Sequence, residues 1–175
     1  MILWLTGMSG VGKTTLAEAV LQLVRAEMPT GVLAVDGDAV RTIWGDDLGY
    51  SEEERLKNMT RMAQLSRYLD GQRCHVVASL VAPYRETREW MRQHVPSYYE
   101  VFITSPLEQL AKRDPKGLYR QALAGETGLP GVNQRYETPE SPDMTIDNTG
   151  NLDALLAYAR PLSDLVLRND RIHSL

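Results

Sequence analysis

The stretch Gly7-Met8-Ser9-Gly10-Val11-Gly12-Lys13-Thr14 decides the fold of this chain. It fits the pattern G-x-x-x-x-G-K-[ST] at every fixed position. Glycines allow such a loop to wrap so that successive backbone N–H groups converge on phosphate oxygens, and the helix that follows presents its positive end to them. The motif needs a strand before it and a helix after it. Residues 2–6 form a short apolar run and residues 14–27 carry apolar side chains at helical spacing, so both are predicted.

The motif assigns a chemical task to its polar residues. The Lys13 ammonium would reach the β- and γ-phosphates of ATP as a point charge, which makes it a candidate catalytic residue. The Thr14 hydroxyl would ligate the Mg²⁺ carried with the nucleotide. The candidate ATP contacts are the loop and the first helical residues: Gly7, Met8, Ser9, Gly10, Val11, Gly12, Lys13, Thr14 and Thr15. A chance glycine-rich turn is the alternative, but it does not account for the two matching flanks.

Two carboxylates follow the second apolar run. Residues 32–35 are apolar and lead into Asp36-Gly37-Asp38. If the run is a strand of a parallel sheet, these acids lie at its carboxyl edge, where ligands bind in such sheets. An acid there can hold the metal ion or accept the proton of an attacking hydroxyl. We therefore expect Asp36 to be a metal ligand or base and Asp38 to be a second catalytic carboxylate. A polar Asp-Gly turn is the alternative.

Strand and helix patterns alternate through the rest of the chain, which predicts a parallel sheet with helices on both faces. Ser51 and Glu54 predict a capping box at the start of a helix. We expect strands at 2–6, 32–35, 74–81, 99–104 and 144–146, and helices at 14–27, 51–70, 85–94, from 106, at 116–124 and from 152 with an interruption at Pro161. The predicted fold class is α/β: a three-layer P-loop nucleotide-kinase fold with a five-stranded parallel sheet, in one domain over residues 1–175.

Two segments beyond the phosphate loop have an expected role in this fold. Glycines and prolines between residues 125 and 142 predict a mobile flap rather than core, within a lid region of about 113–142. The C-terminal segment from Leu152 has apolar residues at helical spacing. These residues either cover the sheet or form part of a homodimer contact, and the sequence leaves both alternatives open: Leu155, Leu156, Leu162, Leu165 and Val166.

Composition limits the class of protein. Of the 175 residues 43% are hydrophobic and 24% charged, which is ordinary globular usage and excludes a disordered chain. The net charge of −4 argues against binding to nucleic acid through a general basic surface. No apolar run approaches the ~18 residues of a membrane span, and the apolar N-terminus lacks the basic leader of a signal peptide. We expect a cytoplasmic protein with neither a membrane nor a nucleic-acid partner.

A GTPase-type switch is an alternative use of the phosphate loop. Asp147-Asn148-Thr149-Gly150 matches D-x-x-G, and Ala111-Lys112-Arg113-Asp114 has part of the base-reading pattern N-K-x-D. The second motif precedes the first, which is the wrong order, and its asparagine is absent. The sequence therefore disfavours a GTP switch.

Several further stretches, taken together with the phosphate loop, resemble the adenylylsulfate kinases. They are residues 36–41 and 48–55, Asn58, Pro83-Tyr84-Arg85, residues 104–108, 113–119 and 124–126, and Tyr136-Glu137. The stretch from Arg113 to Tyr119 is the most specific, because generic P-loop kinases do not carry it. The resemblance runs from Trp4 to about Thr149. It implies transfer of the γ-phosphoryl group from MgATP to the ribose 3′-hydroxyl of adenylyl sulfate.

The resemblance also implies roles for individual residues. Arg113 and Lys116 would belong to a lid near ATP, and Tyr50 would lie against the base of the acceptor nucleotide. The acceptor contacts would be Asp38, Arg41, Tyr50, Arg55, Asn58, Pro83, Tyr84, Lys116, Leu129 and Arg135. Without the motif, the arginines would be interpreted as a solvated helix face and Tyr50 as a core aromatic.

Four departures from the family pattern bear on the acceptor. Ala82 stands where many members have a serine, Thr60 replaces the first of two adjacent arginines, and Leu129 stands where a phenylalanine stacks on the acceptor adenine. The segment after Glu126 is one residue short and lacks a lysine, whose charge Arg135 could restore. We expect these changes to face the acceptor. They leave open a sister kinase for another nucleotide, such as cytidine diphosphoramidate. A non-catalytic ATP-binding switch is the alternative from another class.

Overall fold

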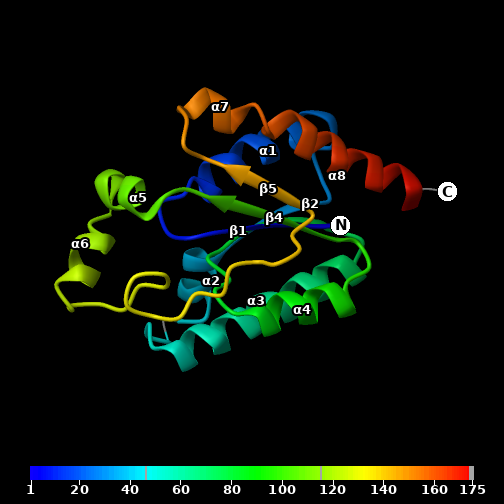
Figure 1. Ribbon diagram of the computed structural model, residues 1–175. Coiled ribbons are helices and arrows are strands. Elements are labelled where there is room, and N and C mark those ends of the chain that lie inside the picture. Colours follow the sequence, from blue (N-terminus) through cyan, green and yellow to red (C-terminus); the bar gives the residue numbers. More distant parts are fainter. Residues whose placement is uncertain (46, 115, 174–175) are drawn as a thin grey trace.

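A five-stranded parallel sheet lies at the centre of the structure (Figure 1). The computed structural model describes residues 1–45, 47–114 and 116–173, the last four by their backbone alone. Pro115, which belongs to the stretch with the most specific family resemblance, lies outside these residues. The strand order is β2-β3-β1-β4-β5, and the strands are β1 (Ile2–Thr6), β2 (Val32–Asp36), β3 (His75–Ser79), β4 (Tyr98–Thr104) and β5 (Met144–Asp147). The predicted parallel sheet is confirmed.

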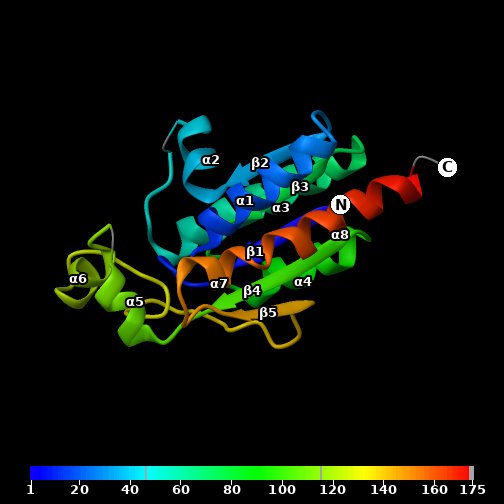
Figure 2. The ribbon, with the colours of Figure 1, turned by 90° about the horizontal axis from the view of Figure 1, so that it is seen from above.

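Helices cover both faces of the sheet, as Figures 1 and 2 show. One face carries α1 (Lys13–Glu27), α7 (Leu152–Leu156) and α8 (Ala159–His173). The opposite face carries α2 (Gly37–Ile43), α3 (Glu52–Gly71) and α4 (Arg85–His94). The two short helices α5 (Leu107–Arg113) and α6 (Leu118–Leu123) lie beyond one end of the sheet. This is the predicted three-layer arrangement.

Alternate residues of the central strand fill two separate cores. Leu3 and Leu5 of β1 pack into the cluster that contains α1 and α8, whereas Ile2 and Trp4 pack into the cluster beneath α3 and α4. All four are fully buried. Successive side chains of a strand point to opposite faces, so a strand covered on both sides must be apolar throughout. This explains why the strand reads as a continuous apolar run.

The structure corrects several predicted element boundaries. The strand predicted over 74–81 ends at Ser79, and a helix that the sequence did not indicate, α2, follows β2 directly. The predicted interruption at Pro161 is wrong, because the break falls at residues 157–158 and Pro161 lies in the first turn of α8. A proline is tolerated in a first turn, where the missing N–H has no partner within the helix. None of the described helices is long and apolar enough to cross a membrane.

The segment predicted as a flap, residues 125–142, forms a loop that leaves α6 beyond the carboxyl ends of the strands and runs back to the start of β5 (Figure 1). Its Leu129 is 4% exposed and belongs to the hydrophobic cluster of Tyr119 and Ala122, so the expectation that this segment lies outside the core is wrong at this residue. The Asn133 side chain accepts the Leu129 N–H and donates to the carbonyls of Ala122 and Thr127. These hydrogen bonds fold the loop back on α6.

Three of the five apolar side chains that the sequence identified in the C-terminal segment are buried within this chain. Leu155 of α7 and Leu162 and Val166 of α8 belong to the same core as α1. These three residues cover the sheet, which is one of the two alternatives that the sequence left open, whereas Leu156 and Leu165 are only partly buried.

Replacement of Leu162 by alanine is expected to destabilise the protein by about 2–5 kcal/mol, because the side chain is fully buried and its loss leaves a cavity between α8 and α1. Urea unfolding measures this change. Leu152→Ala is the matched control, since Leu152 is 56% exposed and should cost far less. Equal losses in the two variants would show that α8 does not stabilise the chain through this core.

Candidate active site

A cavity of about 610 Å³ opens at the carboxyl ends of β1, β2 and β3. Its wall consists of the phosphate loop with the start of α1, residues 36–38 at the end of β2, residues 79–81 at the end of β3, and parts of the segment 114–130. Parallel strands bring all of these chain reversals to one edge of the sheet. The cavity therefore joins the phosphate loop, the predicted carboxylates and the predicted lid.

The phosphate loop is shaped by glycines that have no room for a side chain. Gly7 has φ 147°, and a Cβ there would lie 2.2 Å from the carbonyl oxygen of Ile103 in β4. Gly12 has φ 98°, and its Cβ would lie 2.6 Å from Leu155 Cδ2. Two side chains also fasten the loop from outside: Tyr119 Oη donates to the Ser9 carbonyl at 2.8 Å, and Asn148 Nδ2 donates to the Val11 carbonyl at 3.0 Å.

Lys13 lies at the floor of the loop and is 8% exposed. Its Nζ donates to the carbonyls of Gly7 at 3.0 Å and Met8 at 2.9 Å. Burial lowers the pKa of Lys13 to about 8, and the carboxylates of Asp38 and Asp36 oppose that shift. The ammonium thus has neutral partners at hydrogen-bond distance, and an anion in the loop would compensate its buried charge.

Asp36, Thr14 and Ser79 meet at the carboxyl edge of the sheet. Asp36 is the register partner of Ser79 across β2 and β3, and Ser79 Oγ lies 3.2 Å from Thr14 Oγ1. Asp36 also caps α2: its Oδ1 accepts the N–H of Asp38 at 3.0 Å and that of Ala39 at 3.2 Å. Both cap bonds go to Oδ1. This oxygen therefore holds the carboxylate in place, and Oδ2 takes no part in the cap.

A hydroxyl and a carboxylate are oxygen ligands of the kind that Mg²⁺ prefers. Thr14 and Asp36 both line the cavity, so the predicted metal ligands fit the ion that accompanies ATP. In the part of the chain that the structure describes, no group of three or more His, Cys, Asp or Glu side chains could hold a metal ion. The two residues therefore suit a hydrated ion that arrives with the nucleotide.

The predicted acceptor side is built around Tyr50. The Tyr50 ring, 53% exposed, lies 4.7 Å from the Arg41 guanidinium carbon and 5.0 Å from that of Arg55. Tyr50 and Arg55 line the cavity, together with Asp38, Lys116 and Leu129. Lys116 Nζ also forms an exposed ion pair with Asp38 Oδ2 at 3.4 Å. Five of the predicted acceptor contacts therefore face one space.

Arg55 also fastens the loop 125–142 to α3. Its Nη2 donates to the Gly128 carbonyl at 2.8 Å, and its Nε donates to Gln134 Oε1 at 2.9 Å. Gln134 Nε2 in turn donates to the Tyr50 carbonyl at 2.8 Å. Burial lowers the pKa of the Arg55 guanidinium, and the charge of Arg41 lowers it further.

The other predicted acceptor residues lie beside the cavity and do not line it. Arg41 is buried and donates to the carbonyls of Leu48 and Gly49, so it holds the loop that carries Tyr50. Asn58 is buried on α3, and its Oδ1 has no hydrogen-bond partner among the described residues. The remaining three, Pro83, Tyr84 and Arg135, bind Glu137 or Glu52: Pro83 accepts the Glu137 N–H, Tyr84 donates to the Glu52 carbonyl, and Arg135 pairs with the Glu137 carboxylate.

Some predicted ATP contacts also lie outside the wall. Ser9, Gly10, Gly12, Lys13, Thr14 and Thr15 line the cavity, whereas Gly7, Met8 and Val11 do not. Arg113 does not line it either, and donates to the carbonyls of Asn148 and Gly150 at 3.3 and 3.4 Å. The D-x-x-G segment thus supports the phosphate loop from behind, through Asn148.

Sequence reasoning missed three residues that the structure places at the site: Ser79, Tyr119 and Asn148. Ser79 could have been found, because it ends a strand at the same edge of the sheet as Asp36. Tyr119 and Asn148 stand in stretches that the sequence analysis quoted, but their contacts with the loop had no local signal, since each reaches it from more than a hundred residues away.

The departures from the family pattern are not gathered at the acceptor wall. Leu129 lines the cavity, and so do Thr127 and Gly128 of the shortened segment. Thr60, by contrast, lies in a separate groove of about 280 Å³ beside Trp90, between α3 and α4, and Ala82 is fully buried. The expectation that these positions all face the acceptor is therefore wrong for Thr60 and Ala82.

The pKa of Lys13 predicts how stability changes with pH. Between pH 8 and 10.5 the unfolded chain binds more protons than the folded one, so the free energy of unfolding rises with pH in this window. Below pH 8 the buried charge costs about 3 kcal/mol in the absence of nucleotide.

Lys13→Met should therefore be more stable than the native protein at pH 7, and its advantage should shrink between pH 8 and 10.5. Urea unfolding across this range measures the difference. Lys112→Met, which removes an exposed lysine, is the control, and a difference that does not vary with pH would contradict the prediction.

The comparison with known proteins agrees with the geometry of the site. The sequence pattern of the adenylylsulphate kinase family matches residues 1–147. A probable adenylyl-sulfate kinase of Archaeoglobus fulgidus is 42% identical over 151 residues, and the match covers 86% of this chain and 97% of the relative. An adenylyl-sulfate kinase of Picosynechococcus is 40% identical, and the match covers 81% of this chain and 80% of the relative. The APS kinase CysC of Mycobacterium tuberculosis, solved in complex with AMPPNP and APS, is 30% identical with a TM-score of 0.81, covering 94% of this chain and 95% of its own. This chain belongs to the adenylylsulfate kinase family.

Proposed function

We propose that this chain transfers the γ-phosphoryl group of ATP to the ribose 3′-hydroxyl of adenylyl sulfate, which yields ADP and 3′-phosphoadenylyl sulfate. One observation carries the proposal beyond family membership. The phosphate loop, the carboxylates of Asp36 and Asp38, and the aromatic and basic wall of Tyr50 and Arg55 border a single cavity. Phosphoryl transfer depends on positioning and on stabilisation of charge, and this cavity provides groups for both partners.

The phosphate loop binds the donor. Backbone N–H groups at the start of α1 point toward the phosphates, and the Lys13 ammonium exchanges its carbonyl partners for phosphate oxygens. Thr14 and Asp36 would hold the Mg²⁺ that accompanies ATP, and the ion would supply positive charge to neutralise the transferred group. Tyr119 and Asn148 keep the loop in shape from outside, so the binding geometry exists before the nucleotide arrives.

The acceptor occupies the part of the cavity bordered by Tyr50, Arg55 and Leu129. The Tyr50 ring is available to lie against a base, and Arg41 and Arg55 hold it in place. The 3′-hydroxyl is directed to Asp36 or Asp38, which can accept its proton. Ala82 has no hydroxyl, so the phosphoryl group passes directly from donor to acceptor without a covalent intermediate at that position.

Adenylyl sulfate is favoured over another nucleotide because two of the four departures, Thr60 and Ala82, do not line the cavity. Leu129 replaces an aromatic stack, whose loss costs about 0.5–1.5 kcal/mol, or up to roughly tenfold in affinity. Thr60 lies in the groove beside Trp90, and its neighbour Arg61 forms a two-pronged ion pair with Asp47. A loss of this size weakens the binding of adenylyl sulfate but does not select a different acceptor.

The proposal is tested by measuring ADP release from MgATP with adenylyl sulfate and with a panel of other nucleotides that includes cytidine diphosphoramidate. We expect rapid turnover with adenylyl sulfate. Turnover with a cytidine nucleotide and none with adenylyl sulfate would assign the chain to a different acceptor. ATP binding without turnover on any acceptor would instead indicate a non-catalytic switch.

Asp36→Asn separates the charge of Asp36 from its structural role. An asparagine Oδ1 can still accept the two N–H groups at the start of α2, so the fold should be retained. Loss of the carboxylate should lower kcat by about 10²–10⁴. Steady-state kinetics and thermal unfolding measure the two effects, with Asp153→Asn, at an exposed helix start, as control. A kcat within a few-fold of the native value would exclude Asp36 as metal ligand or base.

A further inference from the structure

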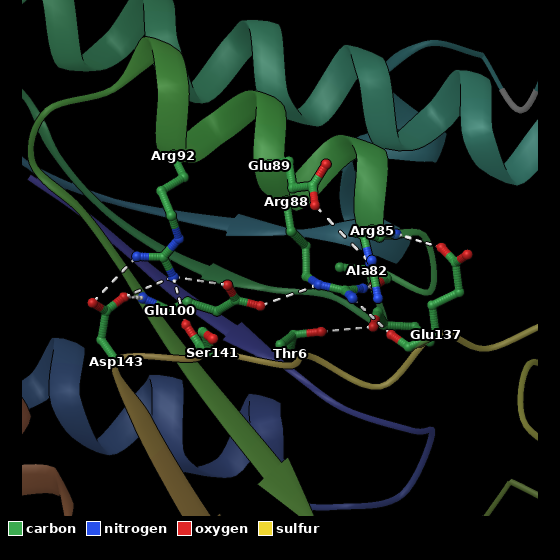
Figure 3. A network of polar contacts seen from close by, with 11 residues as sticks. Thr6, Ala82, Arg85, Arg88, Glu89, Arg92, Glu100, Glu137, Ser141 and Asp143 are labelled. Atoms are coloured by element: carbon green, nitrogen blue, oxygen red, sulfur yellow. Dashed lines mark hydrogen bonds and ion pairs between the residues drawn. The ribbon is translucent and has the colours of Figure 1, made fainter.

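Arg88 of α4 is a buried arginine that joins three separate segments of the chain (Figure 3). It is 4% exposed. Its Nε lies 3.2 Å from Glu100 Oε1 in β4, its Nη1 donates to the Ala82 carbonyl at 2.7 Å, and its Nη2 donates to the Glu137 carbonyl at 2.7 Å. Every edge of the guanidinium therefore has a partner.

The first of these segments is the loop that follows β3. Ser79, Leu80 and Val81 line the active-site cavity, and Ala82 comes next. Ala82 is fully buried with φ 43°, a left-handed conformation that a residue with a Cβ rarely adopts. Contacts must hold the chain there. Arg88 supplies one at the Ala82 carbonyl, and Thr6 Oγ1 supplies another by donating to the Val81 carbonyl at 2.8 Å.

The second segment is the end of the loop 125–142. The Glu137 N–H donates to the Pro83 carbonyl at 2.8 Å, and Glu137 Oε2 accepts the Arg85 N–H at 2.6 Å. Arg88 bridges the carbonyls of Ala82 and Glu137, so the two loops are closed against each other at this point. The same loop 125–142 contributes Leu129 to the cavity wall and contacts Arg55 through Gln134.

We propose that Arg88 is a positioning residue for the acceptor nucleotide. It touches neither substrate; it fixes the wall at Leu80 and Val81 and ties that wall to the end of the loop 125–142. The wall lies on the acceptor side because Leu80 packs beside Gly37, the residue between Asp36 and Asp38. A Cβ built on Gly37 would lie 3.5 Å from the Leu80 Cβ. The phosphate loop is fastened by Tyr119 and Asn148 instead. The inference rests on the proposed kinase function.

An arginine is required at this position by geometry. The planar guanidinium directs its N–H groups along fixed directions and can bind two carbonyls and a carboxylate together. A lysine ammonium is a compact point charge on a shorter side chain. Arg88→Lys therefore keeps the positive charge opposite Glu100 but releases at least one of the two carbonyls.

Arg92, one turn further along α4, is a matched control. It binds the same carboxylate, through Glu100 Oε2 at 3.1 Å, together with Asp143 Oδ2 at 3.1 Å and the Ser141 carbonyl at 3.3 Å (Figure 3). These partners belong to β4 and to the segment that leads into β5. Arg92 thus shares the charge network of Arg88, but its carbonyl partner is Ser141, at the end of the loop 125–142 next to β5, and it does not contact the carbonyls of Ala82 and Glu137.

The test compares Arg88→Lys with Arg92→Lys in steady-state kinetics, using whichever acceptor the native enzyme turns over. We expect Arg88→Lys to raise the KM of the acceptor about tenfold and to leave the KM of ATP within twofold, and Arg92→Lys to change neither. An unchanged acceptor KM in Arg88→Lys, or equal rises for acceptor and ATP, would overturn the inference.

Amide hydrogen exchange tests the same contact without catalysis. The Glu137 and Arg85 N–H groups should exchange faster in Arg88→Lys than in the native protein, and at the native rate in Arg92→Lys. Unchanged exchange in Arg88→Lys overturns the inference whatever the acceptor proves to be. A native enzyme that is inactive on adenylyl sulfate overturns the proposed function alone.

A double variant covers the case in which Arg88→Lys does not fold. Arg88→Met with Glu100→Gln removes both buried charges together, so neither is left unpaired, and such replacements are often tolerated. This variant should fold and show the same rise in acceptor KM. A folded double variant with the native acceptor KM would contradict the role of Arg88.

Discussion

The close approach of Gly7 to the backbone of β4 is the constraint on which the site depends. The chain leaves β1 so near to Ile103 that no side chain fits at this position, and the turn that results opens the phosphate loop toward the carboxyl edge of the sheet. Parallel pairing then determines what the loop meets. Leu5 of β1 is the register partner of Ser79, and Ser79 is the partner of Asp36. Thus one backbone contact and two strand registers bring together residues that are far apart in sequence.

The sequence predicted the parts of this arrangement that have local signals. A strand, a glycine loop and a helix follow one another along the chain, and apolar runs identify all five strands. The short helix α2 escaped prediction because its stabilising feature is a cap: Asp36 accepts two N–H groups at its start, in a stretch that also fits a turn. The break before α8 was misplaced for a related reason, since proline both ends helices and begins them.

Individual site residues were harder to predict than elements, and the arginines show why. Arg41, Arg55, Arg88 and Arg113 are chemically identical, yet Arg55 alone among these four lines the cavity. Arg41, Arg88 and Arg113 each donate to backbone carbonyls of a loop. What an arginine does depends on which carbonyls lie within its reach after folding. Those carbonyls belong to loops distant in sequence, and a loop carbonyl leaves no trace in the pattern of residue types.

These buried arginines also explain how loops with many glycines and prolines can form a defined cavity. A loop carries backbone carbonyls that need partners when they are buried, and a guanidinium can satisfy two of them at once. Arg41 does so for residues 48 and 49, Arg55 for residues 50 and 128, and Arg88 for residues 82 and 137. The acceptor side is therefore shaped by paired carbonyls. At the phosphate loop, burial lowers the pKa of Lys13, so the free protein bears an electrostatic cost that an anion bound in the loop would relieve.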